Sequence, residues 1–126
     1  MTLPNIIVLT GNDSRHKYFI HHLNANFRIS EVYIEKSSYP CPEPQSDEEG
    51  AAWDWFFQNR DRHEEKQIQN SNRLSAKNKP KLIYLDSDEL NSLNIIAQIK
   101  KTNPGFIAVF GTGILSTVFL QNFPDR

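Results

Sequence analysis

The sequence predicts an α/β fold with a mainly parallel sheet and flanking helices. Four short apolar, β-branched runs, typical of buried strands, alternate along the chain with segments of helical spacing. Two of these runs stop abruptly at a glycine, as strands do where the chain turns toward a helix. A chain of 126 residues with 38% hydrophobic and 23% charged content fits one globular domain over residues 1–126, or a piece of a larger one.

The first βα unit is predicted from residues 6–24. Residues 6–10 have the apolar composition of a buried strand, which Gly11 closes. Residues 12–14 (Asn, Asp, Ser) are typical helix caps, and we expect a helix from there to about Asn24. A second strand is expected over residues 27–35, with an irregularity at Ser30 and Glu31 where the β-branched pattern breaks.

The middle of the chain is expected to hold a loop and one long helix. Residues 36–49 are rich in Ser, Pro and acid, which favours an extended, exposed loop. A helix is predicted from about Glu48 to Gln69, and residues 70–79 are expected to be mobile because they are polar and lack periodicity. The residues that share one face of this helix, and so predict that it docks against something, are Trp53, Phe56, Phe57 and Arg60.

The last third predicts two further strands and two helical segments. Residues 81–85 and 106–110 have strand composition, and the second run is expected to be covered on both faces of the sheet. A helix is predicted from about Asn91 to Thr102, with a final helical turn or two over residues 116–122. The apolar seam expected for the longer helix consists of Leu93, Ile96 and Ala97, with Ile95 and Ile99 alongside.

Two glycine turns are the candidate binding segments. In an open α/β sheet, ligands bind at the carboxyl ends of the strands, and Gly-containing turns let the backbone approach a ligand closely. The turn after residues 106–110 consists of Gly111, Thr112, Gly113, Ile114 and Leu115. The turn after residues 6–10 consists of Gly11, Asn12, Asp13 and Ser14. The structural alternatives are a plain strand-to-helix turn for the first and helix capping by Asp13 for the second.

Composition and sequence patterns give no indication of DNA binding, membrane insertion or metal binding. A net charge of −1 gives no general argument for DNA binding, although residues 60–81 are locally basic and could face an anion or simply solvent. The sequence has no membrane-length apolar run and no signal-peptide pattern, and its single cysteine, Cys41, fits a reducing compartment, so we expect a cytoplasmic protein. Four scattered histidines form no recognisable metal motif, so no metal ligand is assigned.

Several segments together resemble the formyltransferase family, which includes methionyl-tRNA, glycinamide ribonucleotide and sugar N-formyltransferases. The matching segments are Thr10-Gly11-Asn12, residues 15–19 (Arg-His-Lys-Tyr-Phe), residues 110–116 (Phe-Gly-Thr-Gly-Ile-Leu-Ser), Phe119-Leu120 and Phe123-Pro124. Residues 57–66 also resemble the linking helix of one bacterial branch of such proteins. The resemblance implies a Rossmann-like amino-terminal part of a formyltransferase domain and 10-formyltetrahydrofolate as the one-carbon donor.

The resemblance also implies roles for the two turns. The segment matching Gly111 to Leu115 lines the folate pocket in that family, largely through backbone groups and apolar contact. The turn matching Gly11 to Ser14 faces the acceptor in some members, which implies a small-molecule amine or sugar-nucleotide substrate. Asp13 makes a phosphate-bearing acceptor less suited to this turn.

One departure from the family bears directly on catalysis. Family members continue from the Phe-Pro segment into an Asn-x-His triplet and a later Asp, and this sequence contains no Asn-x-His. Formyl transfer needs an oxyanion stabiliser and a base placed together, so no catalytic residue is assigned. The leading hypothesis is a truncated amino-terminal part that needs a complementary carboxyl-terminal chain. The alternatives are a non-catalytic folate- or nucleotide-binding module, and a ligand-free fragment whose unpaired sheet edge favours a homodimer.

Overall fold

The computed structural model of the protein describes residues 4–36, 43–71 and 79–125, and residues 68–71 by their backbone only. The chain forms two compact units, which are described separately below. The first consists of residues 1–39 and 76–126, and the second of residues 40–75. All the strands of the described residues belong to the first unit, together with both glycine turns.

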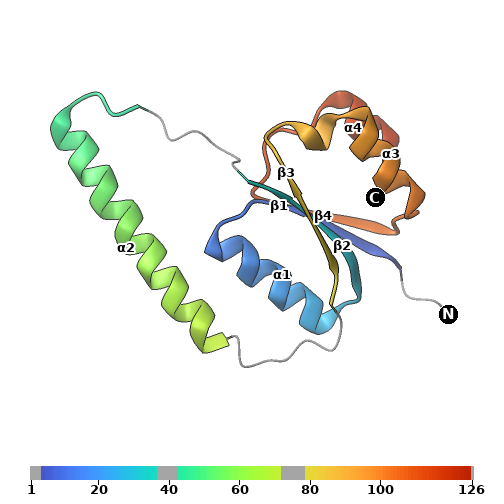
Figure 1. The fold of residues 1–126 in the computed structure, drawn as a ribbon, viewed down its shortest axis with the longest axis horizontal. Helices are drawn as coiled ribbons and strands as arrows, with labels where there is room; N and C mark the ends of the chain where they lie inside the picture. The colour runs from blue at the N-terminus through green and yellow to red at the C-terminus, as the bar shows by residue number, and fades with distance from the viewer. Residues whose placement is uncertain (1–3, 37–42, 72–78, 126) are drawn as a thin grey trace. The chain divides into compact units, whose positions relative to one another are not determined.

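The first unit has a four-stranded, all-parallel sheet in a Rossmann-like α/β arrangement (Figure 1). Its strands lie in the order β3-β2-β1-β4. Their bounds are β1 Ile6–Thr10, β2 Ile29–Glu35, β3 Lys81–Leu85 and β4 Phe106–Phe110. Its helical segments are α1 Ser14–Asn26, the 3-10 turn η1 Glu89–Asn91, α3 Leu93–Lys101 and α4 Thr117–Asn122. The predicted fold class is therefore confirmed.

The predicted irregularity in the second strand is a one-residue shift in strand register. Ile6 of β1 pairs with Ile29, but the next residue, Ile7, pairs with Glu31, so Ser30 is the extra residue. Its hydroxyl donates a hydrogen bond to the Asn5 side-chain oxygen. A polar residue with a local partner suits a bulge, because the extra residue has no place in the regular strand pairing.

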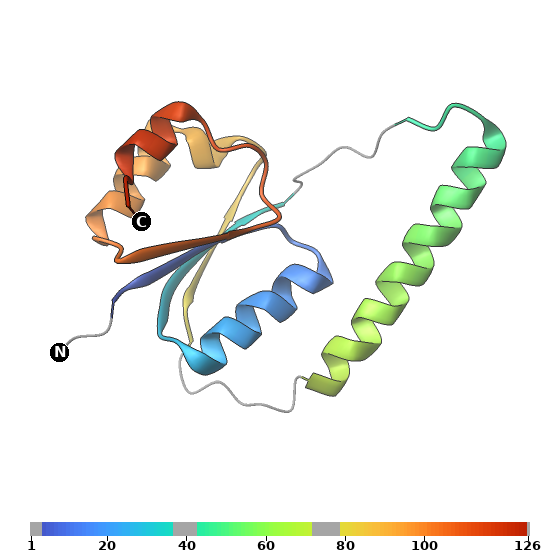
Figure 2. The same cartoon turned by 180° about the vertical axis from the view of Figure 1, so that it is seen from behind.

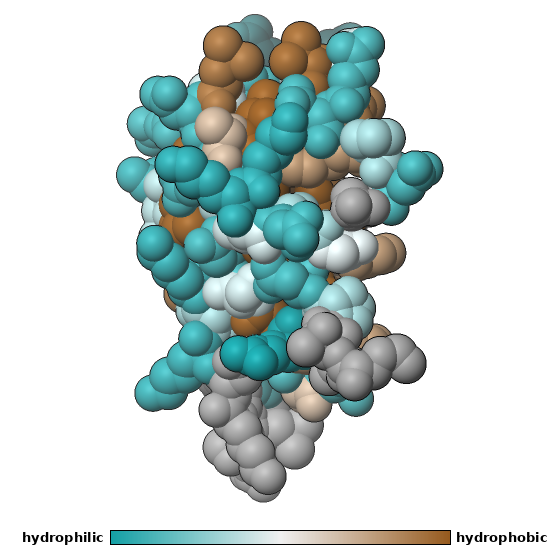
Figure 3. All heavy atoms as spheres, turned by 90° about the vertical axis from the view of Figure 1, so that its right-hand side faces the viewer, coloured by the Kyte–Doolittle hydropathy of each residue, from teal (hydrophilic) through white to brown (hydrophobic). Residues whose placement is uncertain are grey.

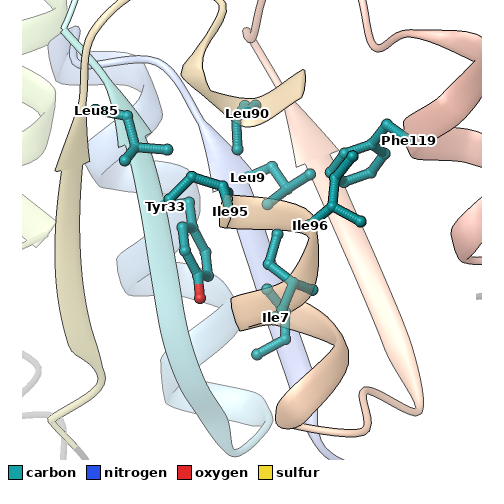
Figure 4. Packing of buried hydrophobic residues seen from close by; sticks show 9 residues of the cluster. Ile7, Leu9, Tyr33, Leu85, Leu90, Ile95, Ile96 and Phe119 are labelled. Atoms are coloured by element: carbon teal, nitrogen blue, oxygen red, sulfur yellow. The ribbon is translucent and has the colours of Figure 1, made fainter. Parts of the chain in front are cut away.

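Helices cover both faces of the sheet, as Figures 1 and 2 show from opposite sides. Side chains alternate between the two faces of a strand, so each strand contributes to two cores. On the α1 face the buried residues are Val8, Ile29, Val32 and Ile34, with Phe19, Ile20 and Leu23 of α1 partly buried against them. On the face of α3 and α4 they are Ile7, Leu9, Tyr33, Leu85, Leu90, Ile95, Ile96, Ile99 and Phe119 (Figure 4).

The expectation that residues 106–110 are covered on both faces is wrong. Among the described strands β4 lies at the edge of the sheet beside β1, and Phe106, Val109 and Phe110 are exposed. Ile107 and Ala108 still pack against the two cores. An apolar run shows that a strand is suited to burial, but the order of strands in the sheet decides how much of it is covered.

The predicted seam of the helix after β3 is also partly wrong. Leu93 is 75% exposed and Ala97 is exposed, whereas Ile95, Ile96 and Ile99 are buried. Both sets of residues follow helical spacing, and the face that packs against the sheet is the one that carries Ile95, Ile96 and Ile99. The helix begins after Ser92, whose hydroxyl accepts a hydrogen bond from the Ile95 N–H (3.3 Å). Exposed apolar residues lie on both α3 and α4, among them Leu93 and Leu120. Figure 3 shows hydrophobic (brown) atoms exposed at the top of the face that it views.

The second unit contains one helix, α2, over Asp47–Ser71, close to the predicted bounds. The Ser46 hydroxyl caps its first turn by accepting a hydrogen bond from the Glu49 N–H (3.1 Å). Trp55 and Phe56 are exposed on the helix. Of the loop expected over 36–49, residues 37–42 with Cys41 lie outside the described residues, and 47–49 belong to the helix. Residues 72–78 of the segment expected to be mobile also lie outside the described residues.

Candidate functional site

The two glycine turns end the neighbouring strands β1 and β4 at the point where the strand order reverses. From β1 the chain moves to β2 and β3 on one side, and it returns to place β4 on the other side of β1. The helices change face accordingly, with α1 on one face and α3 and α4 on the other (Figure 2). In open α/β sheets this switch point, outside the carboxyl ends of the strands, is where ligands bind.

The turn after β1 is organised by the start of α1. Asp13 is the N-cap residue, with extended backbone angles of φ −83° and ψ 166°. Its carboxylate forms an ion pair with Arg15 (3.0 Å), and its backbone N–H donates a hydrogen bond to His16 Nδ1 (3.0 Å). His16 thus fills the place in a capping box that Glu or Gln usually takes. Asp13 therefore occupies the N-cap position, and its own N–H is satisfied within the protein by His16.

The turn after β4 begins with a left-handed residue, because Gly111 has φ +79°. Thr112 is buried, and its hydroxyl donates a hydrogen bond to the Gly113 carbonyl (2.8 Å). The Gly113 N–H donates to Glu35 Oε2 (3.1 Å). Glu35 ends β2 and is only 3% exposed, so a buried carboxylate from a different strand fixes the middle of this turn.

Asn91, the last residue of η1, holds the far end of the same turn. Its side-chain amide donates to the Ile114 carbonyl (3.0 Å), and its side-chain oxygen accepts from the Ser116 N–H (2.7 Å). Leu115 packs against the core, whereas Ile114 is 84% exposed. The turn is therefore held from inside by two polar side chains and presents an apolar residue outward.

His16 lies between the two turns and is 2% exposed. A Cβ atom added at Gly11 would lie 2.5 Å from His16 Cε1, and one added at Gly111 would overlap Nε2 and lie 2.6 Å from Cδ2. The ring also packs edge-on against Phe110, with centroids 5.1 Å apart. The missing side chains at both glycines are therefore required by the imidazole, whatever ligand the turns face.

The residues that hold the turns were not predicted in these roles. His16 stands in the sequence as one of four scattered histidines and within the matching segment 15–19, with no role at the turns, and neither Glu35 nor Asn91 stands out. The sequence does hold a signal for a buried role of Glu35, because an acidic residue there ends a largely apolar strand. His16 stands three residues after an Asp cap, the position of the reciprocal capping partner.

One titratable group in the core has a shifted pKa. Burial against the helices, reinforced by the hydrogen bond from its hydroxyl to Glu31 Oε2 (2.6 Å), raises the pKa of Tyr33 well above its usual value. The hydroxyl therefore stays protonated at neutral pH and donates to Glu31, while it also accepts a hydrogen bond from the Gln98 side chain, which lowers the pKa by a smaller amount. It points along the core face rather than toward the turns (Figure 4), so it belongs to the fold.

The described residues contain no group of three or more His, Cys, Asp or Glu side chains placed to hold a metal ion. None of the helices within 4–36, 43–71 and 79–125 combines the length and apolar character needed to cross a bilayer. A shallow, open pocket lies beside the amino end of β4, away from the turns, and is lined by Lys100, Asn103, Pro104, Asn122, Phe123 and Pro124.

Comparison with known proteins adds no relative. No protein-family model matches the sequence, and neither a curated protein nor a solved structure matches the chain. The likeness to formyltransferases therefore rests on the sequence segments alone.

Proposed function

We propose that this chain supplies the donor-binding, amino-terminal part of a folate-dependent formyltransferase. In this proposal the turn from Gly111 to Leu115 takes 10-formyltetrahydrofolate, and the turn from Gly11 to Ser14 faces an amine acceptor, with a small amine better suited to Asp13 than a sugar nucleotide. The reaction would take place in the cytoplasm. A complementary carboxyl-terminal segment or chain would supply the base and the oxyanion stabiliser, because the sequence contains no Asn-x-His triplet.

The observation that carries the proposal is the position and rigidity of the second turn. It ends β4 at the topological switch point, and Glu35 and Asn91 hold it by three hydrogen bonds. A preorganised turn loses little conformational freedom when a ligand binds. The exposed Ile114 side chain offers apolar contact for a flat heterocycle such as a pterin.

The arrangement fits a pterin better than it fits a phosphate. The Gly113 N–H is already used by Glu35, and the Asp13 N–H is used by His16. The acceptor turn also carries the Asp13 carboxylate, which would repel an anion although Arg15 offsets part of its charge. Donor recognition would therefore depend on the outer backbone groups of the turn and on apolar contact.

The test is calorimetric titration of the purified chain with 5-formyltetrahydrofolate, a stable analogue of the donor. Gly113→Trp places a bulky side chain in the proposed donor turn, and Leu93→Trp makes the same change at an exposed position on α3. We expect the wild-type chain and Leu93→Trp to bind alike and Gly113→Trp to lose binding. A wild-type chain that is folded by circular dichroism and does not bind would refute the proposal.

A non-catalytic binding module is the second candidate, and one observation favours it. The polar side chains that meet at the turns, namely Glu35, Asn91, Thr112 and His16, all hold the backbone of the turns or of α1. They act as scaffold rather than as reacting groups. Titration of the same chain with ADP separates the two ligand classes, since tighter binding of ADP than of the folate would favour a nucleotide-binding module.

A further inference from the structure

The His16 imidazole contacts both turns of the proposed site and the last residue of β4. It accepts the Asp13 N–H at the start of α1, and its ring carbons leave no room for a Cβ at Gly11 or Gly111. It also packs on Phe110, the last residue of β4. These contacts join segments about 100 residues apart in the sequence, since both residues 11–13 and residues 110–111 contact the ring.

We propose that His16 is a positioning residue that fixes the spacing between the turn at 11–14 and the turn at 111–115. This inference rests on the proposed function, because the folate is proposed to bind the turn at 111–115, whose position against the first turn the ring helps to fix. The two turns already meet where they begin, since the Gly11 N–H donates a hydrogen bond to the carbonyl of Phe110, directly before the second turn (3.3 Å). The ring is 2% exposed and fills the space beside this contact. Removing the ring would leave a cavity into which the rest of either turn shifts.

The hydrogen bond defines which form of His16 does this. Nδ1 accepts the Asp13 N–H, so the ring proton of this neutral imidazole is on Nε2, the atom that faces Gly111. The capping bond and the spacing are two separate roles, since the first uses only Nδ1 and the second uses the volume of the ring. A substitution that keeps one role and loses the other can therefore distinguish them.

The test compares three variants of the full chain. His16→Ala removes both the acceptor and the ring, and His16→Asn keeps a side-chain oxygen that can accept the Asp13 N–H but lacks the ring. His22→Ala is the matched control. His22 lies on the same helix and is exposed, and its ring stacks on Tyr18 of that helix. Each variant is measured for its melting temperature and for its Kd for 5-formyltetrahydrofolate.

We expect His16→Ala to lower the melting temperature and to weaken binding about tenfold or more, since small displacements of a positioned site have effects of this size. His16→Asn should recover part of the melting temperature without recovering the Kd. His22→Ala should match the wild type in both. A purely capping role predicts that His16→Asn restores both quantities, and this result would overturn the proposal, as would an unchanged Kd in a folded His16→Ala chain.

A second measurement does not depend on the ligand. The backbone amide signals of Gly111 and Gly113 in a ¹H–¹⁵N correlation spectrum report the second turn, which belongs to a different element from His16. We expect them to shift in His16→Ala and in His16→Asn, but not in His22→Ala. Unchanged signals in a folded His16→Ala chain overturn the positioning role, whereas a wild-type chain that does not bind the folate overturns only the proposed function.

Discussion

Gly111→Ala is the substitution whose cost the structure defines most directly. Gly111 has φ +79°, a conformation that costs a residue with a side chain about 1–2 kcal/mol. The new methyl group would also overlap the His16 ring, with Cδ2 at 2.6 Å and Cε1 at 2.8 Å. Forcing an extra methyl group into packed surroundings adds about 1–3 kcal/mol. The two terms together predict a loss of about 2–5 kcal/mol in the free energy of unfolding.

A double-mutant cycle with His16→Ala separates the two terms. The three atoms nearest to the added methyl group all belong to the His16 side chain. In the His16→Ala background the overlap disappears and only the backbone cost remains. Gly111→Ala should therefore cost about 1–2 kcal/mol there, which gives a coupling energy of about 1–3 kcal/mol between the two sites.

The assay is urea unfolding followed by far-UV circular dichroism on the four chains of the cycle. The slope of the unfolding free energy against urea must stay constant across the four for the comparison to hold. Free energies that add without coupling would refute the reasoning, because they would mean that the imidazole does not occupy the space beside Gly111. A stable Gly111→Ala chain would refute the left-handed turn as well.

Three further predictions concern the buried groups. Glu35→Ala should lower the free energy of unfolding by about 1–3 kcal/mol through loss of the charge-assisted bond to Gly113. Glu35→Gln keeps an acceptor and should cost less. Unchanged hydrogen exchange at the Gly113 amide in Glu35→Ala would contradict this prediction. The folded state binds the Tyr33 proton more tightly than the unfolded state. The contribution of this proton to stability is therefore complete below about pH 10 and falls as pH rises above that value. Tyr33→Phe should lose this part of the alkaline decline in stability, and a pH profile identical to that of the wild type would disprove the prediction. Ile96→Ala should cost about 2–5 kcal/mol by leaving a cavity, whereas Leu93→Ala, at a mostly exposed site, should cost under about 0.5 kcal/mol; equal losses in urea unfolding would contradict the observed face of α3.

The parts of the fold that depend on local sequence could be predicted. The strand bounds 6–10, 81–85 and 106–110 match because apolar, β-branched runs end at glycine or acidic turns. The bulge at Ser30 was predicted because the strand pattern breaks there. The exposed face of β4 could not be predicted in the same way, because an apolar run does not reveal which strand lies at the edge of the sheet.

The candidate site shows the same division. Both turns follow strands and contain glycine, so their positions could be predicted from the sequence. The residues that hold them could not, because the Glu35–Gly113 bond joins residues 78 apart and the Asn91–Ser116 bond joins residues 25 apart. Such partners are defined only once the strands are ordered as β3-β2-β1-β4, which brings the end of β2 close to the turn after β4.

The use of glycine at the first turn bears on the proposed choice between ligand classes. In dinucleotide-binding sheets a glycine after the first strand lets a pyrophosphate approach the start of the following helix. Here the space that Gly11 leaves is filled by the His16 ring, and the Asp13 N–H is bonded to that ring. The closeness that glycine permits is therefore used for a contact within the protein. Under the proposed function the ligand is recognised from the outer side of the turn at 111–115, where Ile114 is exposed, and this supports the proposal of a flat heterocycle over a phosphate.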